Sequence, residues 1–464
     1  MYLSKQSFLV LGLSRSGTAA AEFLLKEKAK VFLYDDVDGE NIRAAKEKLE
    51  GLGAVSLEKE KLTESVEYCD GLVISPGIPV DHPLAVLYKR SGKAVLGEAE
   101  LAARVKTIPF AAVTGTNGKT TTVSMLAKIF TEAGIKAVAC GNIGAPMLSV
   151  PKDAELAVAE ISSFQMETLN SFRPHAAVVL NITEDHLNRH YTMANYIFLK
   201  RKLLKNLTPT EYAVLNYDDN TVREFAENTK ARIVWFSLRE RVRGAYFEEG
   251  SLYYDGEKVL EADELMLGGA HNLQNALAAI AVAKIFGIKT ETVADALTSF
   301  KGVKHRIEEV GEVEGVLYID DSKATNVDAT LKAISCMKRE TVLLLGGKDK
   351  GYEYKPLFRA LKKGKIIAAV LYGENRYKLL SAAREEGFEP VTVCGKFAEA
   401  VTIAKTVAKE GQTVLLSPAS ASFDEFTGYE ERGEVFVEAV KSFERAVRAG
   451  KDEAALSLAQ EDGE

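Results

Sequence analysis

The residues with the clearest chemical meaning form the stretch T-G-T-N-G-K-T-T, from Thr114 to Thr121. Backbone N–H groups of such a loop can cradle phosphates, the ammonium of Lys119 can neutralise the β- and γ-phosphates, and a threonine hydroxyl can reach Mg²⁺. The common phosphate-binding pattern has a further glycine where this chain has Val113, so this loop is a shortened one. Glycine, lysine and two threonines coincide at a predicted strand–helix junction, which disfavours a turn without a ligand. We predict a nucleoside-triphosphate site here.

A second glycine motif, G-L-S-R-S-G, runs from Gly12 to Gly17. It has the spacing of a dinucleotide fingerprint, but Ser14 stands where the second glycine lets the backbone approach a pyrophosphate. Asp35 and Asp36 end the next predicted strand, where an acidic residue often meets a ribose or a base edge. Two interpretations stay open: a tight turn without a ligand, and a site for a nucleotide-diphosphate group at a helix N-terminus.

Polar side chains also stand at the ends of other predicted elements. Glu160 ends an apolar strand, where a carboxylate is useful as a Mg²⁺ ligand. His186 lies in N-I-T-E-D-H-L, and a histidine taken alone is more often packed or solvated than a ligand. Asn272 lies near the start of a predicted helix, and Arg306 and Asp321 lie near later element ends. Open α/β sheets place ligands just beyond the carboxyl ends of their strands.

The elements that must position these residues alternate between short β-rich runs and helical patterns. This alternation is typical of α/β domains with parallel sheets. Residues 244–259 are the exception, because polar and apolar residues alternate there around Asp-Gly, which predicts a β-hairpin. The predicted strands are 7–13, 30–36, 71–77, 108–115, 155–163, 176–183, 212–219, 231–237, 316–322, 341–347, 366–373, 389–395 and 412–420, and a third unit begins around 302–310.

Composition excludes several classes of protein. A chain of 464 residues is too long for one core and predicts two to four domains. The formal net charge of −7 argues against a general nucleic-acid binder. We see neither a signal peptide nor an apolar run long enough to span a bilayer. The four cysteines form no C-x-x-C pair, which favours reduced thiols and a cytoplasmic protein.

Together these motifs resemble the Mur ligases, the ATP-dependent amide-forming enzymes of peptidoglycan assembly. The resemblance covers nearly the whole chain and includes the shortened phosphate loop. It is carried by T-G-T-N-G-K-T-T-T, G-N-I-G (141–144), E-I-S-S-F-Q, T-E-D-H-L, Tyr196-x-x-x-Lys200, H-N-L-Q-N and His305-Arg306. It implies three α/β domains: a Rossmann-like nucleotide-sugar domain over 1–97, a central P-loop-type ATPase domain over 98–302, and a Rossmann-like C-terminal domain over 303–464.

Two further stretches are similar to those of the members that add D-glutamate: D-D-S-K-A-T-N (320–326) and S-P-A-S-A-S-F-D-E-F (417–426). The implied substrates are UDP-N-acetylmuramoyl-L-alanine, D-glutamate and ATP. The implied reaction passes through an acyl phosphate that the amine of D-glutamate attacks. A ligase for another amino acid, and a nucleotide-hydrolysing switch or binding protein, are the alternatives. We expect a monomer that binds no nucleic acid and does not insert into membranes.

The resemblance also assigns roles to single residues. Lys119, Glu160, His186 and Lys200 are the expected catalytic residues, and Thr120, Glu160, His186 and Lys200 the expected Mg²⁺ site, with two ions. The expected ATP-binding residues are Gly115, Thr116, Asn117, Gly118, Lys119, Thr120, Thr121, Asn272, Arg306, Asp321 and Lys323. For the UDP-linked substrate they are Arg15, Ser16, Asp35, Asp36, Gly77, Asn142 and Ser162, and for D-glutamate Thr325, Lys350, Ser422, Phe423 and Tyr429.

Three of these assignments carry alternatives. Val37 follows Asp36 where similar enzymes often have an arginine, and Arg15 is the candidate to compensate. Lys348 competes with Lys350 for the D-glutamate pocket. By residue type alone Lys200 reads as a surface lysine among other basic residues, whereas the resemblance implies that it is carbamylated and helps to organise the metal site.

Overall fold

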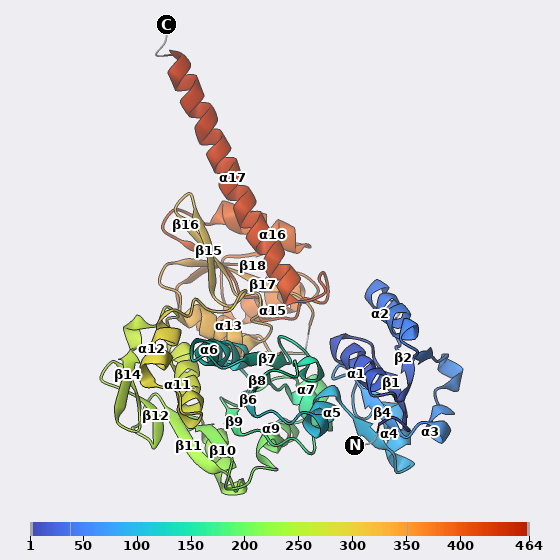
Figure 1. The fold of residues 1–464 in the computed structure, drawn as a ribbon. Helices are drawn as coiled ribbons and strands as arrows, with labels where there is room; N and C mark the ends of the chain where they lie inside the picture. The colour runs from blue at the N-terminus through green and yellow to red at the C-terminus, as the bar shows by residue number, and fades with distance from the viewer. Residues whose placement is uncertain (1–2, 38, 350, 462–464) are drawn as a thin grey trace. The chain divides into compact units, whose positions relative to one another are not determined.

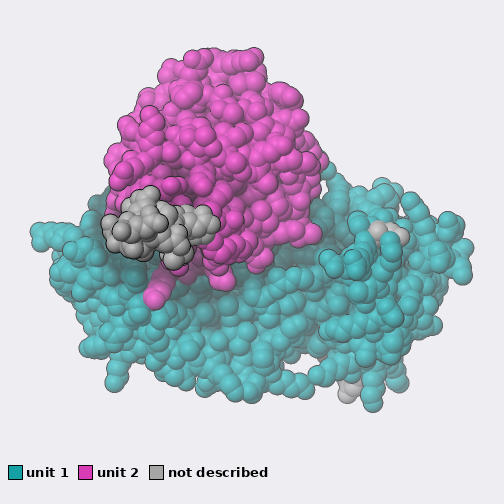
Figure 2. Space-filling model, turned by 90° about the horizontal axis from the view of Figure 1, so that it is seen from above, with its two compact units in different colours: residues 1–300 teal, residues 301–464 magenta. Residues whose placement is uncertain are grey.

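The structure is a computed structural model that describes residues 3–37, 39–349 and 351–461. The chain divides into two compact units, residues 1–300 and 301–464 (Figure 2). Three sheets with helices packed on them make up the chain, two in the first unit and one in the second (Figure 1). The predicted α/β class is therefore confirmed. The domain boundaries near residues 97 and 302 stay a prediction.

The first sheet of unit 1 is parallel throughout, with the strand order β3-β2-β1-β4-β5. Its three central strands, β1, β2 and β4, are short apolar runs whose residues are nearly all buried, as expected when helices cover both faces of a sheet. The elements are β1 (Ser7–Leu11), α1 (Arg15–Lys26), β2 (Lys30–Tyr34), α2 (Glu40–Gly51), β3 (Val55–Ser56), α3 (Ser65–Tyr68), β4 (Gly71–Ile74), α4 (Pro83–Arg90) and β5 (Ala94–Leu96).

The second sheet of unit 1 has nine strands in the order β14-β13-β12-β11-β10-β9-β6-β8-β7. The strands from β7 to β12 are parallel to their neighbours, whereas β12, β13 and β14 form an antiparallel meander. The strands are β6 (Phe110–Thr114), β7 (Ala137–Gly141), β8 (Leu156–Glu160), β9 (Ala176–Val179), β10 (Tyr212–Asn216), β11 (Arg232–Ser237), β12 (Gly244–Glu248), β13 (Ser251–Tyr254) and β14 (Glu257–Glu261).

The predicted hairpin over 244–259 is thus part of a three-stranded antiparallel meander, β12-β13-β14. Asp255-Gly256 makes the turn between β13 and β14, as predicted, and a second turn at Glu249-Gly250 joins β12 to β13. The helices of this part are α5 (Glu98–Val105), α6 (Lys119–Glu132), α7 (Ser163–Thr168), α8 (Leu187–His190), α9 (Met193–Arg201), α10 (Asn220–Glu224), α11 (Ala270–Ile285) and α12 (Thr290–Thr298), with the 3₁₀ turn η2 (Met147–Ser149).

Unit 2 is built on a six-stranded sheet with the order β15-β16-β20-β17-β18-β19. Only β15 is antiparallel to its neighbour, and separate apolar clusters pack on the two faces of the sheet. The elements are β15 (Glu308–Val313), β16 (Val316–Asp320), α13 (Val327–Ser335), β17 (Thr341–Gly346), α14 (Lys355–Leu361), β18 (Ile366–Tyr372), α15 (Arg376–Glu386), β19 (Val391–Val393), α16 (Phe397–Val407), β20 (Thr413–Leu416) and α17 (Tyr429–Glu461).

Within the described residues, no helix is both long enough and apolar enough to cross a membrane.

Candidate active site

The phosphate-binding motif occupies the turn between β6 and α6. Gly115 and Gly118 adopt φ angles of 144° and 88°, a region that favours glycine. A Cβ on Gly118 would come within 2.2 Å of the Asn275 side-chain oxygen, so a larger residue fits neither the backbone nor the space. Lys119 is the first residue of α6. The loop therefore ends at a helix N-terminus, where N–H groups favour an anion.

Two side chains of this loop fit a phosphate ligand. The Lys119 ammonium donates to the carbonyl oxygens of Gly115, at 3.0 Å, and Thr116, at 2.7 Å, so it is folded over the loop. The hydroxyl of Thr121 is buried and has no hydrogen-bond partner among the described residues. Buried polar groups are normally paired, so an orphan hydroxyl in this loop is what a site for a polar ligand leaves behind.

The edge of the sheet brings further polar groups to this loop, because β6 lies between β8 and β9. Glu160, at the end of β8, pairs in register with Val113. Asn181, just beyond β9, accepts from the Asn117 backbone N–H at 2.9 Å and donates back to the Asn117 carbonyl at 3.1 Å. Asn181 was not predicted as a site residue. Its position directly after a buried strand was the available signal.

Glu160 has the surroundings expected of a ligand for a divalent cation. Its carboxylate is buried and accepts from the Thr120 hydroxyl and from the Asn142 amide, each at 2.8 Å. Within the described parts of the chain, no basic group lies within ion-pair distance of it. A buried carboxylate held by neutral donors alone suits a hard cation with oxygen ligands.

Lys200 is not a surface residue, since its exposed fraction is 1%. Its amine, on α9, donates to the Gly115 carbonyl at 2.8 Å and to the Thr114 hydroxyl at 3.3 Å. Burial and then the positive charge of Lys119 bring the pKa of Lys200 well below its usual range, although Asp185 and Glu160 oppose the shift. The structure thus rules out the surface interpretation and places a buried amine with a lowered pKa beside the phosphate loop.

His186 lies at the start of α8 in a left-handed conformation with φ of 54°. Its Nε2 is 3.5 Å from a carboxylate oxygen of the buried Asp185, and its ring lies against Phe164 with centroids 4.7 Å apart. A non-glycine residue with positive φ is strained and is often part of a site. Asp185, which sequence reasoning missed, is the acidic partner in this corner.

The start of α11 also meets the loop. The Thr122 hydroxyl donates to the Asn275 oxygen at 3.4 Å, and the Asn275 amide donates to Asn272 at the same distance. Both asparagines are buried. Asn272, which is predicted to contact the nucleotide, is therefore linked through Asn275 to the first turn of α6.

The residues predicted to bind the UDP-linked substrate lie around the glycine motif of the first sheet. Both carboxylate oxygens of Asp35 accept from backbone N–H groups, those of Leu13 at 2.6 Å and Val37 at 2.9 Å. Asp35 therefore holds the glycine loop against the end of β2. Asp36 is exposed, accepts from the Tyr34 hydroxyl at 3.0 Å and remains available to a ligand.

The other predicted substrate residues occupy several elements of unit 1. Arg15 and Ser16 are in the first turn of α1, and Arg15 donates to the Gly144 carbonyl. Gly77 follows β4 and accepts from the Arg189 guanidinium at 3.0 Å. Ser162 caps α7. The Arg15 contact joins the segments after β1 and β7, and the Gly77 contact joins the segment after β4 to α8.

In unit 2, Asp321 is buried at the end of β16. It accepts from the Ser417 hydroxyl at 2.7 Å and from the Ile307 N–H at 3.3 Å. Burial raises its pKa to about 7, against the effect of Arg306. The Nε of Arg306 is buried and lacks a hydrogen-bond partner among the described residues. This unused donor is free to meet a phosphate or a carboxylate.

The preceding residue, His305, is fixed from two sides. Its Nδ1 pairs with an Asp320 carboxylate oxygen at 2.7 Å, a bond that raises the pKa of the imidazole. Its backbone N–H donates to Glu308 at 2.7 Å. Gly433 makes room for the ring, because a Cβ there would come within 2.1 Å of Nδ1. His305 thus holds Arg306 in place.

The residues predicted for D-glutamate lie on the loops around the same sheet edge. The Lys323 amine donates to the Tyr429 hydroxyl and lies 4.1 Å from the centroid of its ring. Ser422 is buried, whereas 69% of Phe423 is exposed. Thr325 is half-buried two residues after Lys323.

Lys350 lies outside the described residues. Its competitor Lys348 is exposed and pairs with Glu374 at 2.5 Å.

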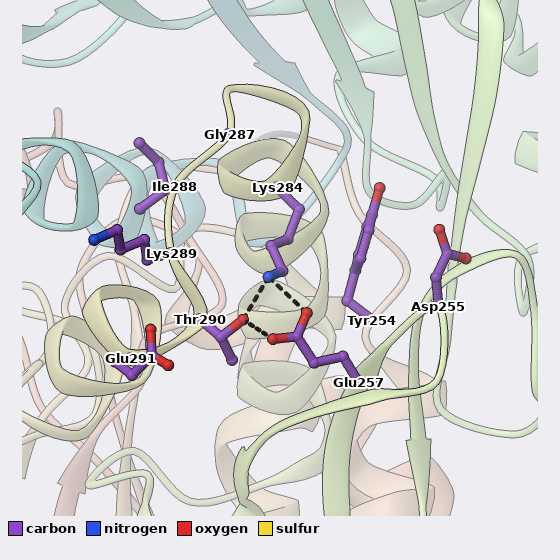
Figure 3. Close-up of a pocket in the computed structure, with 9 residues that line it drawn as sticks. All are labelled: Tyr254, Asp255, Glu257, Lys284, Gly287, Ile288, Lys289, Thr290 and Glu291. Atoms are coloured by element: carbon purple, nitrogen blue, oxygen red, sulfur yellow. Dashed lines mark hydrogen bonds and ion pairs between the residues drawn. The ribbon is translucent and has the colours of Figure 1, made fainter.

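A separate pocket of about 570 Å³ lies between the β13–β14 turn and the junction of α11 and α12 (Figure 3). The Lys284 amine donates to Glu257 at 2.9 Å, and both groups also bond to Thr290, so these two charges of the pocket are paired with each other. None of the predicted site residues lines it. We assign no ligand to this pocket.

Comparison with known proteins decides the family. Residues 113–283 match the Mur ligase middle domain, and residues 305–420 match the Mur ligase glutamate ligase domain. This chain belongs to the Mur ligase family. The first matched region contains the phosphate loop, Glu160 and Lys200. The second contains Arg306 and Asp321.

Relatives within the family match over almost their whole length. A UDP-N-acetylmuramoylalanine–D-glutamate ligase from Pelotomaculum thermopropionicum is 42% identical over 458 residues, which cover 95% of this chain and 99% of the relative. The ligase of the same name from Clostridioides difficile is 38% identical, covering 95% of this chain and all of the relative.

Solved structures of the family share the fold. The UDP-N-acetylmuramate–alanine ligase from Thermotoga maritima has a TM-score of 0.61 at 18% identity, covering 94% of this chain and 100% of that one. A pseudomurein peptide ligase from Methanothermus fervidus has a TM-score of 0.59 at 20% identity, covering 94% and 100%.

Proposed function

We propose that this Mur ligase joins D-glutamate to UDP-N-acetylmuramoyl-L-alanine, with hydrolysis of ATP to ADP and phosphate. The observation that carries the proposal is the near-complete match to curated ligases of that name. The shortened phosphate loop between β6 and α6 supports the use of ATP. The stretches 320–326 and 417–426 support D-glutamate as the amino acid.

The chemistry has two steps. The alanyl carboxylate attacks the γ-phosphorus and releases ADP, which gives an acyl phosphate. The amine of D-glutamate then attacks the acyl carbon, loses a proton and expels phosphate. Negative charge gathers on the transferred group in the first step and on the acyl oxygen in the second, so preorganised donors should supply much of the rate.

The loop residues divide this work. The N–H groups at the start of α6 and the ammonium of Lys119 would hold the phosphates of ATP. Thr120, Glu160 and His186 would hold Mg²⁺, which supplies positive charge beside the transferred phosphate. The buried carboxylate of Glu160, without a cationic partner in the described chain, fits this role. Arg306, with its unused Nε, would bind a phosphate or carboxylate.

A panel assay tests the assignment. The purified protein receives ATP, Mg²⁺ and UDP-N-acetylmuramoyl-L-alanine with one amino acid at a time, and phosphate release is measured. We expect fast release with D-glutamate alone. Equal turnover with L-lysine or L-alanine would move the protein to another member of the family, and release without any amine acceptor would favour a nucleotide-hydrolysing switch.

We propose further that Lys200 is carbamylated. Its amine adds to CO₂ and loses a proton, so a neutral amine becomes a carboxylate-like anion. Burial brings the pKa of the Lys200 amine well below its usual range, which favours the unprotonated form that the addition needs. An anion here would suit Mg²⁺ beside Glu160, whereas an ammonium would repel it.

Lys200→Ala tests the carbamate. We expect the variant to lose most of its activity and to regain part of it with added acetate or formate, which can occupy the vacant anion position. Lys205→Ala is the control, because Lys205 is exposed and contacts Asn170 instead. A ¹³C carbamate signal after growth on labelled bicarbonate should be present in the wild type and absent from Lys200→Ala. Full activity of the variant without a carboxylate would exclude the role.

We also propose that the protein acts as a cytoplasmic monomer on small-molecule substrates. Four free cysteines and a substrate set of ATP and a UDP-linked sugar agree with this location. Light scattering coupled to gel filtration tests the oligomeric state.

A further inference from the structure

Arg432 is the largest fully buried side chain of the described residues, with an exposed fraction of 0%. It lies in the first turn of α17, on the residues that follow the loop 417–426. Arginine is almost never fully buried unless its charge is paired. The position of this guanidinium therefore needs a specific explanation.

The guanidinium joins two loops that lie far apart in the sequence. Its Nε donates to the Ser322 hydroxyl at 2.9 Å, and one terminal nitrogen donates to the Ser322 carbonyl at 2.8 Å. The other terminal nitrogen donates to the carbonyls of Ser420, at 3.2 Å, and Ala421, at 3.4 Å. Arg432 thus ties the loop 320–326 to the loop 417–426.

The same turn of the helix adds a second tie to the first loop. The Ser322 hydroxyl donates to the Tyr429 carbonyl at 2.8 Å. Ser322 is therefore held between Tyr429 and Arg432, three residues apart on α17. Its neighbours Asp321 and Lys323 are both predicted site residues, so the helix start fixes where their side chains begin.

The other end of the guanidinium is confined by Gly347, after β17. Its φ of 137° favours glycine, and a Cβ there would lie 2.1 Å from the Ala421 carbonyl oxygen and 3.2 Å from an Arg432 nitrogen. The Lys348 N–H donates to the same Ala421 carbonyl at 2.8 Å. The guanidinium and the backbone of Lys348, a candidate for the D-glutamate pocket, thus share the Ala421 carbonyl as an acceptor.

All the acceptors of Arg432 are neutral. In the described part of unit 2, no carboxylate lies within ion-pair distance of the guanidinium. Burying a charge without a partner is costly, whereas an apolar residue in its place would leave four acceptor contacts unmade. The flat fork of arginine reaches both loops at once, which the single ammonium of lysine does not. A full positive charge is thus kept beneath two loops predicted to hold an amino acid with two carboxylates.

We infer that Arg432 is a positioning residue for D-glutamate. It holds the loops 320–326 and 417–426 in fixed positions relative to each other and gives their surroundings a positive potential. This inference rests on the proposed function. Arg432 contacts none of the residues assigned to the UDP-linked substrate, because those residues all lie in unit 1. Loss of the guanidinium should therefore weaken the binding of D-glutamate and leave the binding of the UDP-linked substrate unchanged.

Steady-state kinetics of Arg432→Lys and Arg432→Met test the inference. We expect the KM for D-glutamate to rise at least about tenfold in both variants, the size of one lost hydrogen bond to a charged group. The KM for the UDP-linked substrate should stay within about twofold of the wild type. Ser322→Ala, which removes one of the four contacts of Arg432 and the bond to the Tyr429 carbonyl, should raise the KM for D-glutamate less than Arg432→Met does.

Arg445→Met is the matched control. Arg445 lies on the same helix, is exposed and pairs only with Glu438 among the described side chains, so its loss should leave every KM unchanged.

Chemical rescue gives a further test. Guanidinium chloride at millimolar concentration should lower the KM for D-glutamate of Arg432→Ala and leave that of the wild type unchanged.

The outcomes separate the two proposals. A wild type that releases no phosphate with D-glutamate overturns the proposed function. Wild-type turnover combined with an unchanged KM for D-glutamate in Arg432→Lys overturns the positioning role, even if Arg432→Met fails to fold. An equal rise of the KM values of all substrates would also overturn it, since that marks a general loss of structure.

Discussion

Single residues of the phosphate loop lead to a direct test of catalysis. Lys119 folds over the loop through the carbonyls of Gly115 and Thr116. In the reaction its ammonium would meet charge that grows on the β- and γ-phosphates, so its loss should be felt most in the transition state. We expect Lys119→Ala to lower kcat by about 100-fold or more with an unchanged melting temperature.

Lys128→Ala serves as the control for that experiment. Lys128 lies further along α6 and pairs with Glu132 at 2.5 Å on the surface. The kcat of Lys128→Ala should equal that of the wild type. A near-normal kcat in Lys119→Ala would remove the loop from the catalytic site.

A buried carboxylate outside the site gives a pH-dependent prediction. Glu98, in the first turn of α5, accepts from the Leu148 N–H at 2.6 Å, and its second oxygen has no partner in the described chain. Burial raises its pKa to about 7 from an ordinary value of 4.5. The folded state therefore keeps the proton that the unfolded state loses, and stability falls as the pH rises from about 4.5 to about 7.

Glu98→Gln removes that titration. We expect its free energy of unfolding to lie within about 1 kcal/mol of the wild type at pH 5 and to exceed the wild type by about 3 kcal/mol at pH 8, with a higher melting temperature there. Glu100→Gln is the contrasting variant: burial alone would raise the pKa of Glu100, but donors from Asn170, Ser171 and Arg104 outweigh it and lower that pKa. Glu100→Gln should lose stability at both pH values. A gap that does not change with pH would contradict the assignment for Glu98.

Sequence reasoning reached those residues whose roles depend on local pattern. The shortened loop and Glu160 at a strand end follow from spacing and from position after a strand. It did not reach Arg432 or Asp185, because their burial depends on side chains from distant parts of the chain. The surface interpretation of Lys200 failed for the same reason: neighbouring basic residues in the sequence say nothing about which face of α9 is covered.

At the scale of elements, the β1–α1 turn depends on the close approach of Gly17 to the backbone of Gly12. A Cβ on Gly17 would lie 1.8 Å from the Gly12 carbonyl oxygen, so there is no room for a side chain at this position of α1. Gly17→Ala should shift the loop that Asp35 holds. We expect a lower melting temperature and, if the first sheet binds the UDP-linked substrate, a KM for that substrate raised about tenfold or more.

Gly51→Ala is the matched variant, because Gly51 ends α2 and a Cβ there would meet nothing within 4 Å. It should change neither the KM nor, by more than a small amount, the melting temperature. Equal effects of the two substitutions would contradict the packing argument.

Most of the parallel strands were predicted, because they are continuous apolar runs between turn residues. The short strand β3, the edge strand β5 and the edge strand β7 were not predicted. The meander of β12, β13 and β14 was predicted only in part, since the alternation marks one turn at Asp-Gly and the Glu249-Gly250 turn carries a weaker signal. The order of the strands, which places Asn181 beside the phosphate loop, results from long-range pairing and has no local signal.

At the scale of the whole chain, the residues assigned to ATP and D-glutamate are divided between the two units. The phosphate loop belongs to residues 1–300, whereas Arg306, Asp321 and Arg432 belong to residues 301–464. Each unit has its own sheets and its own apolar clusters, so each should fold alone. We expect fragments 1–300 and 301–464 to melt cooperatively, as followed by circular dichroism, and neither alone to release phosphate in response to D-glutamate. The intact chain is the positive control. Full D-glutamate-dependent release by the first fragment would show that unit 2 has no part in the reaction, and would exclude both the D-glutamate pocket and the role of Arg432.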